Sequence, residues 1–184
     1  MSRYRYLPLS LPGNIRLLRL LPAEESTSVL QCELFEYSLQ NSNNATRPYE
    51  ALSYVWGSEK TPRSVIMGKQ NLKITENLHT ALLHLRDHEI PRIFWIDAVC
   101  INQSDDIEKA QQIPLMAEIY ARASRVVVWI GDAKDDSDQA LEAIRAAGKT
   151  KAHQPPKRAI SALLQRPWFR RIWVSEPSYF SKRN

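Results

Sequence analysis

Three short runs rich in β-branched and aromatic residues recur along this chain, at residues 49–56, 93–99 and 125–130. Such residues favour strands, and a continuous apolar run is typical of a strand buried on both faces. The segments between the runs include stretches with helical spacing. Strands that alternate with helices pair in parallel, because parallel strands need a long crossover connection. The sequence therefore predicts an α/β fold with a mostly parallel sheet flanked by helices.

Two helices are predicted between these runs. The first follows Thr75, whose side chain can cap it, and it carries three leucines on one face: Leu78, Leu82 and Leu85. The second is expected over residues 106–123, where Asp105 and Glu108 have the spacing of a capping box. Pro114 lies inside the second helix and removes a backbone donor, so we expect a kink or a later helix start there.

The rest of the chain supplies shorter elements. In chain order we expect a paired β unit of residues 14–21 and 29–39, a polar loop at 41–48, a hairpin of residues 65–68 and 71–74, a helix capped by Asp136 and Gln139 and ending near Ala147, a linker at 150–156, and a short helix over 157–165. The predicted organisation is an N-terminal β extension and loop (1–48), one domain (49–176) and a tail (177–184).

Composition places the chain among folded proteins outside the secretory route. Of its 184 residues, 43% are hydrophobic and 24% charged, which is ordinary globular usage. No run of about 18 apolar residues exists, and residues 1–12 lack the features of a signal peptide. We therefore expect a cytoplasmic protein with no membrane contact. Cys32 and Cys100 are too few for a disulfide framework, so both are expected to be reduced.

Charge is distributed unevenly along the chain. Residues 1–144 hold 15 Lys/Arg and 19 Asp/Glu, a net charge of −4, whereas residues 145–184 hold 10 basic residues and one acid, a net charge of +9. Such a basic tail is one signature of nucleic-acid binding. Its basic residues are scattered among apolar ones, so we keep nucleic-acid binding only as an alternative.

Several familiar chemistries are disfavoured by motif. With five glycines the chain has no phosphate-binding glycine loop, and it has no Gly-x-Ser-x-Gly nucleophile turn. Cys100 follows a predicted strand but has no evident histidine partner, which favours a buried structural thiol. His84 and His88 lack a third ligand nearby. The acidic run from Asp132 departs from a calcium loop, having Ser137 and Ala143 where glycine and glutamate are needed. We expect no metal and no bound cofactor.

Four blocks of sequence carry a specific resemblance. They read Tyr49-Glu-Ala-Leu-Ser-Tyr-Val-Trp-Gly57, Ile74-Thr-Glu-Asn-Leu78, Trp95-Ile-Asp-Ala-Val-Cys-Ile-Asn-Gln103, and Met116 to Gly131. In this combination and order they resemble the heterokaryon incompatibility (HET) domain of filamentous fungi. The family's last block is usually Trp-Phe-x-Arg-x-Trp-x-x-Gln-Glu. Residues 168–176 read Trp-Phe-Arg-Arg-Ile-Trp-Val-Ser-Glu, which is one residue short and lacks the glutamine.

The resemblance implies a fold and an activity. HET domains are similar to TIR domains, which have a flavodoxin-like sheet, and some TIR relatives hydrolyse NAD with a glutamate that follows a tryptophan. Glu176 after Trp173 is the matching position here. A single carboxylate suffices in principle, because nicotinamide leaves neutral and the oxocarbenium-like transition state needs only negative charge nearby. In this interpretation NAD is a possible substrate and not a bound cofactor.

Ligands in open parallel sheets bind beyond the carboxyl ends of the strands. The candidate substrate-binding residues at those ends are Trp56, Gly57, Asp97, Asn102 and Gln103. Each also has a structural alternative: Trp56 in the core, Asp97 bonded to loop amides, and Asn102 or Gln103 capping the following helix. Glu176 has one too, as a surface ion pair with Arg170 or Arg171.

The predicted function is that of a HET effector of fungal nonself recognition and programmed cell death, with NAD hydrolysis as its candidate activity. Because the final block is one residue short and Pro177 follows Glu176, we expect this activity to be weak or absent. The main alternative is a catalytically inert interaction module of the same fold. The expected partner is another protein or a second copy of the chain, bound through the α/β domain. A buried Asp97 within a strand over 93–99 is part of the structural prediction.

Overall fold

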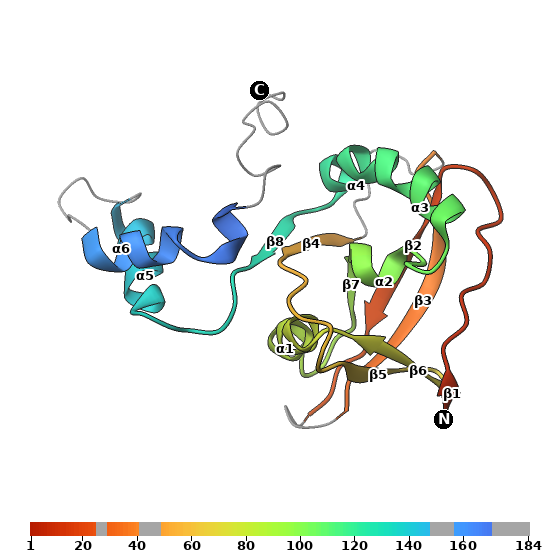
Figure 1. Ribbon diagram of the computed structural model, residues 1–184, viewed down its shortest axis with the longest axis horizontal. Helices are drawn as coiled ribbons and strands as arrows, with labels where there is room; N and C mark the ends of the chain where they lie inside the picture. The colour runs from red at the N-terminus through yellow and green to blue at the C-terminus, as the bar shows by residue number, and fades with distance from the viewer. Residues whose placement is uncertain (25–28, 41–48, 148–156, 171–184) are drawn as a thin grey trace. The chain divides into compact units, whose positions relative to one another are not determined.

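The structure is a computed structural model that describes residues 1–24, 29–40, 49–147 and 157–170. The chain divides into two compact units, residues 1–129 and 130–184. Figure 1 shows the elements of both units in chain order. The linker at 150–156, the loop at 41–48 and the tail at 177–184 lie outside the described residues.

The first unit is built on an eight-stranded sheet. In chain order its strands are β1 (Ser2–Arg3), β2 (Asn14–Leu20), β3 (Gln31–Ser38), β4 (Glu50–Tyr54), β5 (Arg63–Met67), β6 (Gln70–Ile74), β7 (Arg92–Trp95) and β8 (Val126–Trp129). Their order across the sheet is β1-β6-β5-β3-β2-β7-β4-β8. Together with its helices, this sheet confirms the predicted α/β class.

The three β-rich runs form adjacent strands that pair in parallel. Strand β4 lies between β7 and β8 and pairs in parallel with both, with Ala51 opposite Trp95 on one side and Val126 on the other. The predicted N-terminal β unit is confirmed as an antiparallel pair, β2 with β3. Strand β2 also pairs antiparallel with β7. The N-terminal strands are therefore part of the same sheet, which makes it mixed rather than purely parallel.

The predicted hairpin and both helices of the first unit are present. Strands β5 and β6 pair antiparallel. Helix α1 (Glu76–Leu85) begins after Thr75, whose hydroxyl accepts from the Leu78 amide. The second predicted helix is divided into α3 (Asp106–Gln112), a 3₁₀ turn (Ile113–Leu115) and α4 (Met116–Arg122). The interruption falls at Pro114, as expected for a residue with no backbone donor.

The predicted strand over residues 93–99 is wrong in its second half. Strand β7 ends at Trp95, and residues 97–100 form the short helix α2 (Asp97–Cys100). The amides of Val99 and Cys100 both donate to the Ile96 carbonyl. The Asp97 carboxylate accepts from the next amide, that of Ala98. This local bond, together with the tendency of aspartate to leave strands, favours a turn at this position. Asp97 lies in this turn rather than in a strand, and it is partly buried.

The core of the first unit lies against this sheet. Its largest fully buried side chains include Tyr49, Tyr54, Phe94 and Trp95, so Trp95 is a core residue. Its ring packs edge-to-face against Tyr120 at 5.5 Å between centroids, a geometry that aromatic pairs prefer. Among the described residues, no helix has the length and hydropathy needed to cross a membrane.

The second unit contains α5 (Ser137–Ala147), α6 (Lys157–Leu164) and a 3₁₀ turn (Pro167–Arg170). A small apolar cluster of Ala140, Ala159 and Leu163 holds it together. The Arg166 guanidinium donates to the carbonyls of Ile130, Asp132 and Lys134 at 2.9 to 3.0 Å. Arg166 is therefore committed to the structure of this unit.

Candidate functional site

The carboxyl ends of β4 and β7 bring two of the predicted site residues into contact. The Trp56 indole Nε1 donates to Asp97 Oδ2 at 3.0 Å, and Asp97 Oδ1 accepts from the Ala98 amide at 2.8 Å. Both side chains are half-buried. Trp56 follows β4 and Asp97 follows β7, so the parallel pairing of these two strands is what places them together.

The loop after α2 carries Asn102 and Gln103, and it folds back on the same aspartate. Gln103 Nε2 donates to the Asp97 backbone carbonyl at 2.9 Å. Asn102 Oδ1 accepts from the Ser104 amide at 3.2 Å, which closes a tight turn. Asp105 then caps α3 by accepting from the amides of Ile107 and Glu108, both at 3.0 Å. The side chains of Asn102 and Gln103 thus hold the loop that leads into α3.

Gly57 lies beside this cluster in a conformation that suits glycine. Its φ is +78°, in the left-handed region, and a Cβ added there would lie 3.1 Å from the Cβ of Asn77. The backbone at Gly57 therefore lies so close to α1 that a side chain at this position would crowd Asn77.

Gly57→Ala should lower the free energy of unfolding by more than about 1 to 2 kcal/mol, the amount that the left-handed region alone costs a residue with a Cβ, because the close contact with Asn77 adds to that penalty. Gly68→Ala is the matched control, because Gly68 also has positive φ but nothing lies within 4 Å of its added Cβ. Urea unfolding would measure both. A cost at Gly57 no larger than that at Gly68 would show that the approach to Asn77 is unimportant.

Asn77 is a site residue that the sequence analysis missed. Its Nδ2 donates to the Val55 carbonyl, and its Oδ1 accepts from the Trp129 indole Nε1 at 3.0 Å. Asn77 therefore links α1 to the ends of β4 and β8. The signal that pointed to it was the block Ile74-Thr-Glu-Asn-Leu78, in which this asparagine is the one polar residue not explained by capping or by a salt-bridge role.

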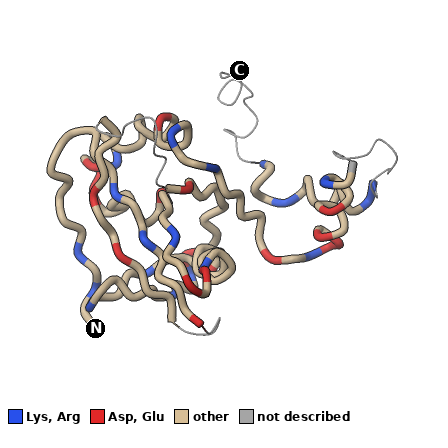
Figure 2. The backbone as a smooth tube through the Cα atoms, turned by 180° about the vertical axis from the view of Figure 1, so that it is seen from behind, with Lys and Arg blue, Asp and Glu red and all other residues tan. Residues whose placement is uncertain are grey.

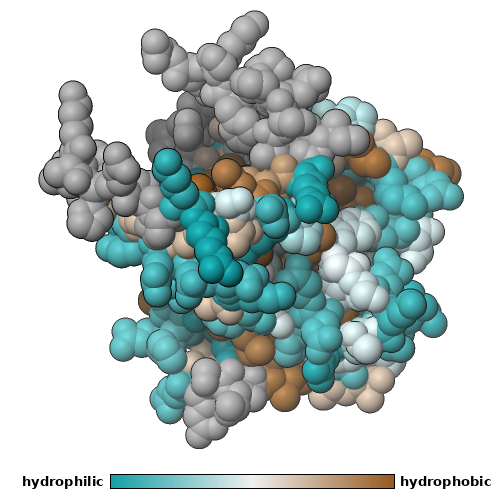
Figure 3. Space-filling model, turned by 60° about the vertical axis from the view of Figure 1, so that its left-hand side comes forward, coloured by the Kyte–Doolittle hydropathy of each residue, from teal (hydrophilic) through white to brown (hydrophobic). Residues whose placement is uncertain are grey.

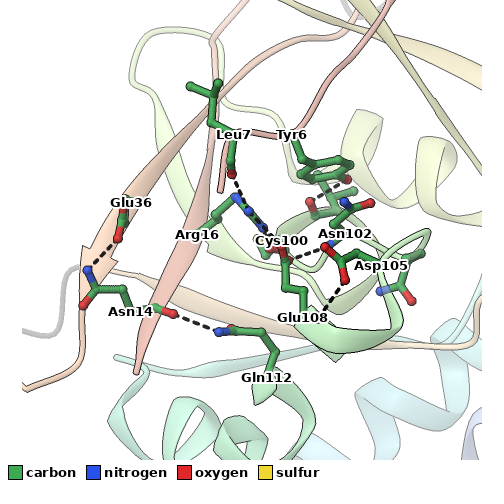
Figure 4. Close-up of polar contacts among 12 residues, drawn as sticks. Tyr6, Leu7, Asn14, Arg16, Glu36, Cys100, Asn102, Asp105, Glu108 and Gln112 are labelled. Carbon is green, nitrogen blue, oxygen red and sulfur yellow. Dashed lines mark hydrogen bonds and ion pairs between the residues drawn. The ribbon is translucent and has the colours of Figure 1, made fainter. Parts of the chain in front are cut away.

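A buried ion pair holds the loop between α2 and α3, which carries Asn102 and Gln103. Arg16 of β2 and Glu108 of α3 form a bidentate pair, with Nη2 to Oε2 at 2.9 Å, and both side chains are nearly inaccessible to solvent. Glu108 Oε1 also accepts from the Asn102 amide at 2.7 Å. Figure 4 shows these contacts converging on the loop between α2 and α3.

The same guanidinium ties down two further backbone segments. Arg16 Nη1 donates to the Cys100 carbonyl at 3.2 Å, and Nη2 donates to the Leu7 carbonyl at 2.6 Å. The Tyr6 hydroxyl donates to the Val99 carbonyl at 2.9 Å. The predicted capping box is therefore only half correct: Asp105 caps α3, but the Glu108 carboxylate bonds Arg16 and Asn102.

Cys100 has the environment of a structural thiol. Its side chain is buried, and burial raises the pKa of the thiol to about 12. Burial likewise raises the pKa of Cys32 to about 12. A thiol that remains protonated is a poor nucleophile. Both cysteines are free, as predicted.

The described residues offer no metal site, and the predicted catalytic glutamate is not among them. Within the described residues, no group of three His, Cys, Asp or Glu side chains could hold a metal ion. His84 packs against Trp129, with 5.0 Å between ring centroids. Glu176 and Trp173 lie outside the described residues. The first part of the same block is described, and there Trp168 and Phe169 pack edge-to-face at 5.1 Å.

Comparison with known proteins agrees with the sequence blocks. The profile of the family described as "Heterokaryon incompatibility protein (HET)" matches residues 49–176. A curated relative, "Heterokaryon incompatibility protein 6, OR allele" of Neurospora crassa, is 38% identical, and the alignment covers 79% of this chain and 23% of the relative. The chain thus spans about a quarter of the length of that relative. No solved structure matches. The family match covers more than half of the chain, and the chain belongs to the HET family.

Proposed function

We propose that this chain acts in heterokaryon incompatibility, as the module that triggers death of the cell after incompatible hyphae fuse. Its membership of the HET family and its similarity to a relative named as a heterokaryon incompatibility protein support this role. One observation links this proposal to a site: Trp56 and Asp97 are in contact at the carboxyl ends of β4 and β7. These residues come from two of the family's sequence blocks, and they meet where open parallel sheets bind ligands.

The test is inducible expression of the chain in fungal hyphae, with dead compartments counted by a vital dye. Asp97→Asn keeps the size of the side chain but removes its negative charge, and it should abolish or strongly reduce death. Asp106→Asn is the matched control, because Asp106 is a solvent-exposed carboxylate at the start of α3. Undiminished death with Asp97→Asn at equal protein level would contradict the proposed site.

NAD hydrolysis is the proposed activity of this module. In that reaction water attacks C1′ of the nicotinamide ribose, the bond to nicotinamide breaks, and the proton from water passes to solvent. Glu176, the position that the resemblance matches, would stabilise the positive charge that develops on the ribose.

We expect the purified chain to hydrolyse NAD weakly or not at all. The final block is one residue short, which in a helix would rotate Glu176 by about 100° relative to Trp173. Release of nicotinamide, followed by chromatography, would measure this activity in wild type and Glu176→Ala. Rapid NAD hydrolysis that Glu176→Ala abolishes would contradict the expected weak activity, and it would establish Glu176 as a catalytic residue. Turnover that survives this change would rule out Glu176 as the catalytic carboxylate.

An inert interaction module is the second candidate, and one observation favours it. The polar side chains of the site are engaged with the protein itself: Trp56 with Asp97, Gln103 with the Asp97 carbonyl, and Asn102 with Ser104. Normal cell death caused by a chain that releases no nicotinamide would support this alternative.

Nucleic-acid binding receives less support from the described part of the tail. Arg166 is bonded to three backbone carbonyls, and Arg145 pairs with Glu142 at 3.0 Å. Figure 2 shows basic and acidic residues interspersed along the body of the chain. A surface that binds phosphates would need its arginines free and gathered on one face.

A further inference from the structure

Two of the three tryptophans of the first unit have their indole N–H bonded to another side chain. Trp56 Nε1 donates to Asp97 Oδ2, and Trp129 Nε1 donates to Asn77 Oδ1, both at 3.0 Å. The third, Trp95, is fully buried, and its Nε1 has no partner among the described residues. Trp56 and Trp129 are only partly buried. Hydrophobic atoms reach the surface between hydrophilic ones (Figure 3), so partial exposure alone does not single out these two rings, whereas their bonded N–H groups do.

The two partners of Asn77 fix the orientation of its side-chain amide. The Trp129 indole N–H can only donate, and the Val55 carbonyl can only accept. Asn77 therefore directs Oδ1 to Trp129 and Nδ2 to Val55, and it uses both ends of the amide. Asparagine meets this need without a charge, whereas an ionised aspartate of the same shape offers only acceptors. The position thus requires a side chain of this size with one donor and one acceptor.

Trp56 lies between two residues whose backbone is close to Asn77. On one side, the Val55 carbonyl accepts from Asn77 Nδ2. On the other side, a Cβ added at Gly57 would lie only 3.1 Å from the Cβ of Asn77. A fixed backbone restricts the rotamers that a side chain can adopt, so these contacts limit where the Trp56 ring can lie. The ring in turn donates to the Asp97 carboxylate.

We propose that Asn77 is the positioning residue of the candidate site. It holds the Trp129 ring directly and the Trp56 ring through the backbone, so that Trp56 stays bonded to Asp97. Asn77 lies in the first turn of α1, and its amide therefore joins this helix to the ends of β4 and β8. The inference rests on the proposed function, because it concerns the site that the module would use. The positions of the two rings, however, can be measured in a protein with no activity.

Asn77→Asp is the informative variant, because it keeps the shape of the side chain. When ionised, the new carboxylate can still accept from Trp129, but it faces the Val55 carbonyl with a second acceptor, and that bond is lost. When protonated, its O–H can donate to Val55 while its other oxygen accepts from Trp129. Both bonds should therefore return as the pH falls from about 7.5 to about 4.5, since the carboxyl group takes up a proton that its surroundings favour.

The readout is the set of indole N–H signals in the NMR spectrum of the nitrogen-labelled chain. At neutral pH, Asn77→Asp should shift the signals of Trp56 and Trp129, and their exchange with solvent should be about fivefold faster than in wild type, as for one lost hydrogen bond. The buried Trp95 indole should not change. At the low end of the pH range, both shifted signals should return to their wild-type positions. A variant that only lost stability would not show this reversal.

Two controls isolate the effect of the amide. Wild type is recorded over the same pH range, because Glu76 beside Asn77, His84 against Trp129, and Asp97 also titrate. Asn71→Asp repeats the substitution on β6, where the Asn71 side chain has no hydrogen bond among the described residues. This control should leave both signals unchanged.

The outcomes separate this inference from the proposed function. A Trp56 signal that Asn77→Asp leaves in place at neutral pH, or a shift that persists at low pH, would overturn the positioning role. Signals that shift and return, together with hyphal death that survives Asp97→Asn, would support positioning by Asn77 and contradict only the proposed site.

Discussion

Arg16→Met should lower the free energy of unfolding by about 3 to 5 kcal/mol, the usual effect of removing one partner from a buried ion pair. The change leaves the Glu108 carboxylate buried without its cation, and both side chains of this pair are nearly inaccessible to solvent. The carbonyls of Leu7 and Cys100 lose their donor at the same time. Chemical denaturation monitored by circular dichroism would measure the loss.

The matched control lies on the same strand. Arg19 of β2 pairs with Glu33 at 2.8 Å, but that pair is exposed. Arg19→Met should therefore cost at most about 1 kcal/mol. A double-mutant cycle with Glu108→Gln should also give a strong coupling between Arg16 and Glu108, since the double variant leaves no charge buried. Equal losses for Arg16→Met and Arg19→Met would show that the buried network contributes little.

The Arg16–Glu108 pair also holds part of the candidate site in place. Glu108 accepts from the Asn102 amide, and Arg16 donates to the Cys100 carbonyl, so one ion pair fixes the start of the loop that follows α2. The loop that carries Asn102 and Gln103 is therefore anchored by residues that would never touch a ligand. This explains how a short loop with partly buried polar residues keeps a defined shape.

The parallel strands of the sheet were predictable because their signal is local. A run such as residues 125–130 favours a strand by its own composition, and its neighbours add turn residues. The capping of α1 by Thr75 and the interruption at Pro114 were predictable for the same reason. Each depends on residues within one turn of the element concerned.

The buried network could not be predicted, because its partners are distant in sequence. Arg16 and Glu108 are 92 positions apart, and Arg16, which lies between two apolar residues of a strand, resembles an outward-facing residue. Glu108 had a sufficient local explanation as a capping-box residue, and this explanation concealed its longer-range role. The end of β7 was missed for a related reason: Ala98, Val99 and Cys100 continue the apolar run, and Asp97 is the one residue whose type marks the change from strand to helix.

Glu50→Gln should lower the free energy of unfolding at neutral pH by about 2 to 3 kcal/mol, the range for hydrogen bonds between charged groups. Glu50 lies at the amino end of β4, opposite to the end that carries the site. It accepts from Arg92 at 2.7 to 3.0 Å and also bonds Arg125. Since Arg92 comes from β7 and Arg125 directly precedes β8, this one carboxylate joins the three adjacent strands β7, β4 and β8. Glutamine of the same size leaves the two arginines close together without a counter-charge.

The effect of Glu50→Gln should also depend on pH. Burial alone would raise the pKa of Glu50, but the hydrogen bonds and charges of Arg92 and Arg125 outweigh burial and hold the pKa below its ordinary value. A depressed pKa means that the stabilisation is complete above the unfolded-state pKa and is lost as the pH falls through the folded-state value. The difference between wild type and Glu50→Gln should therefore be full at pH 7 and shrink below about pH 4. Denaturation curves at several pH values would measure it, and a difference that grows on acidification would show that Glu50 is not held ionised by the two arginines.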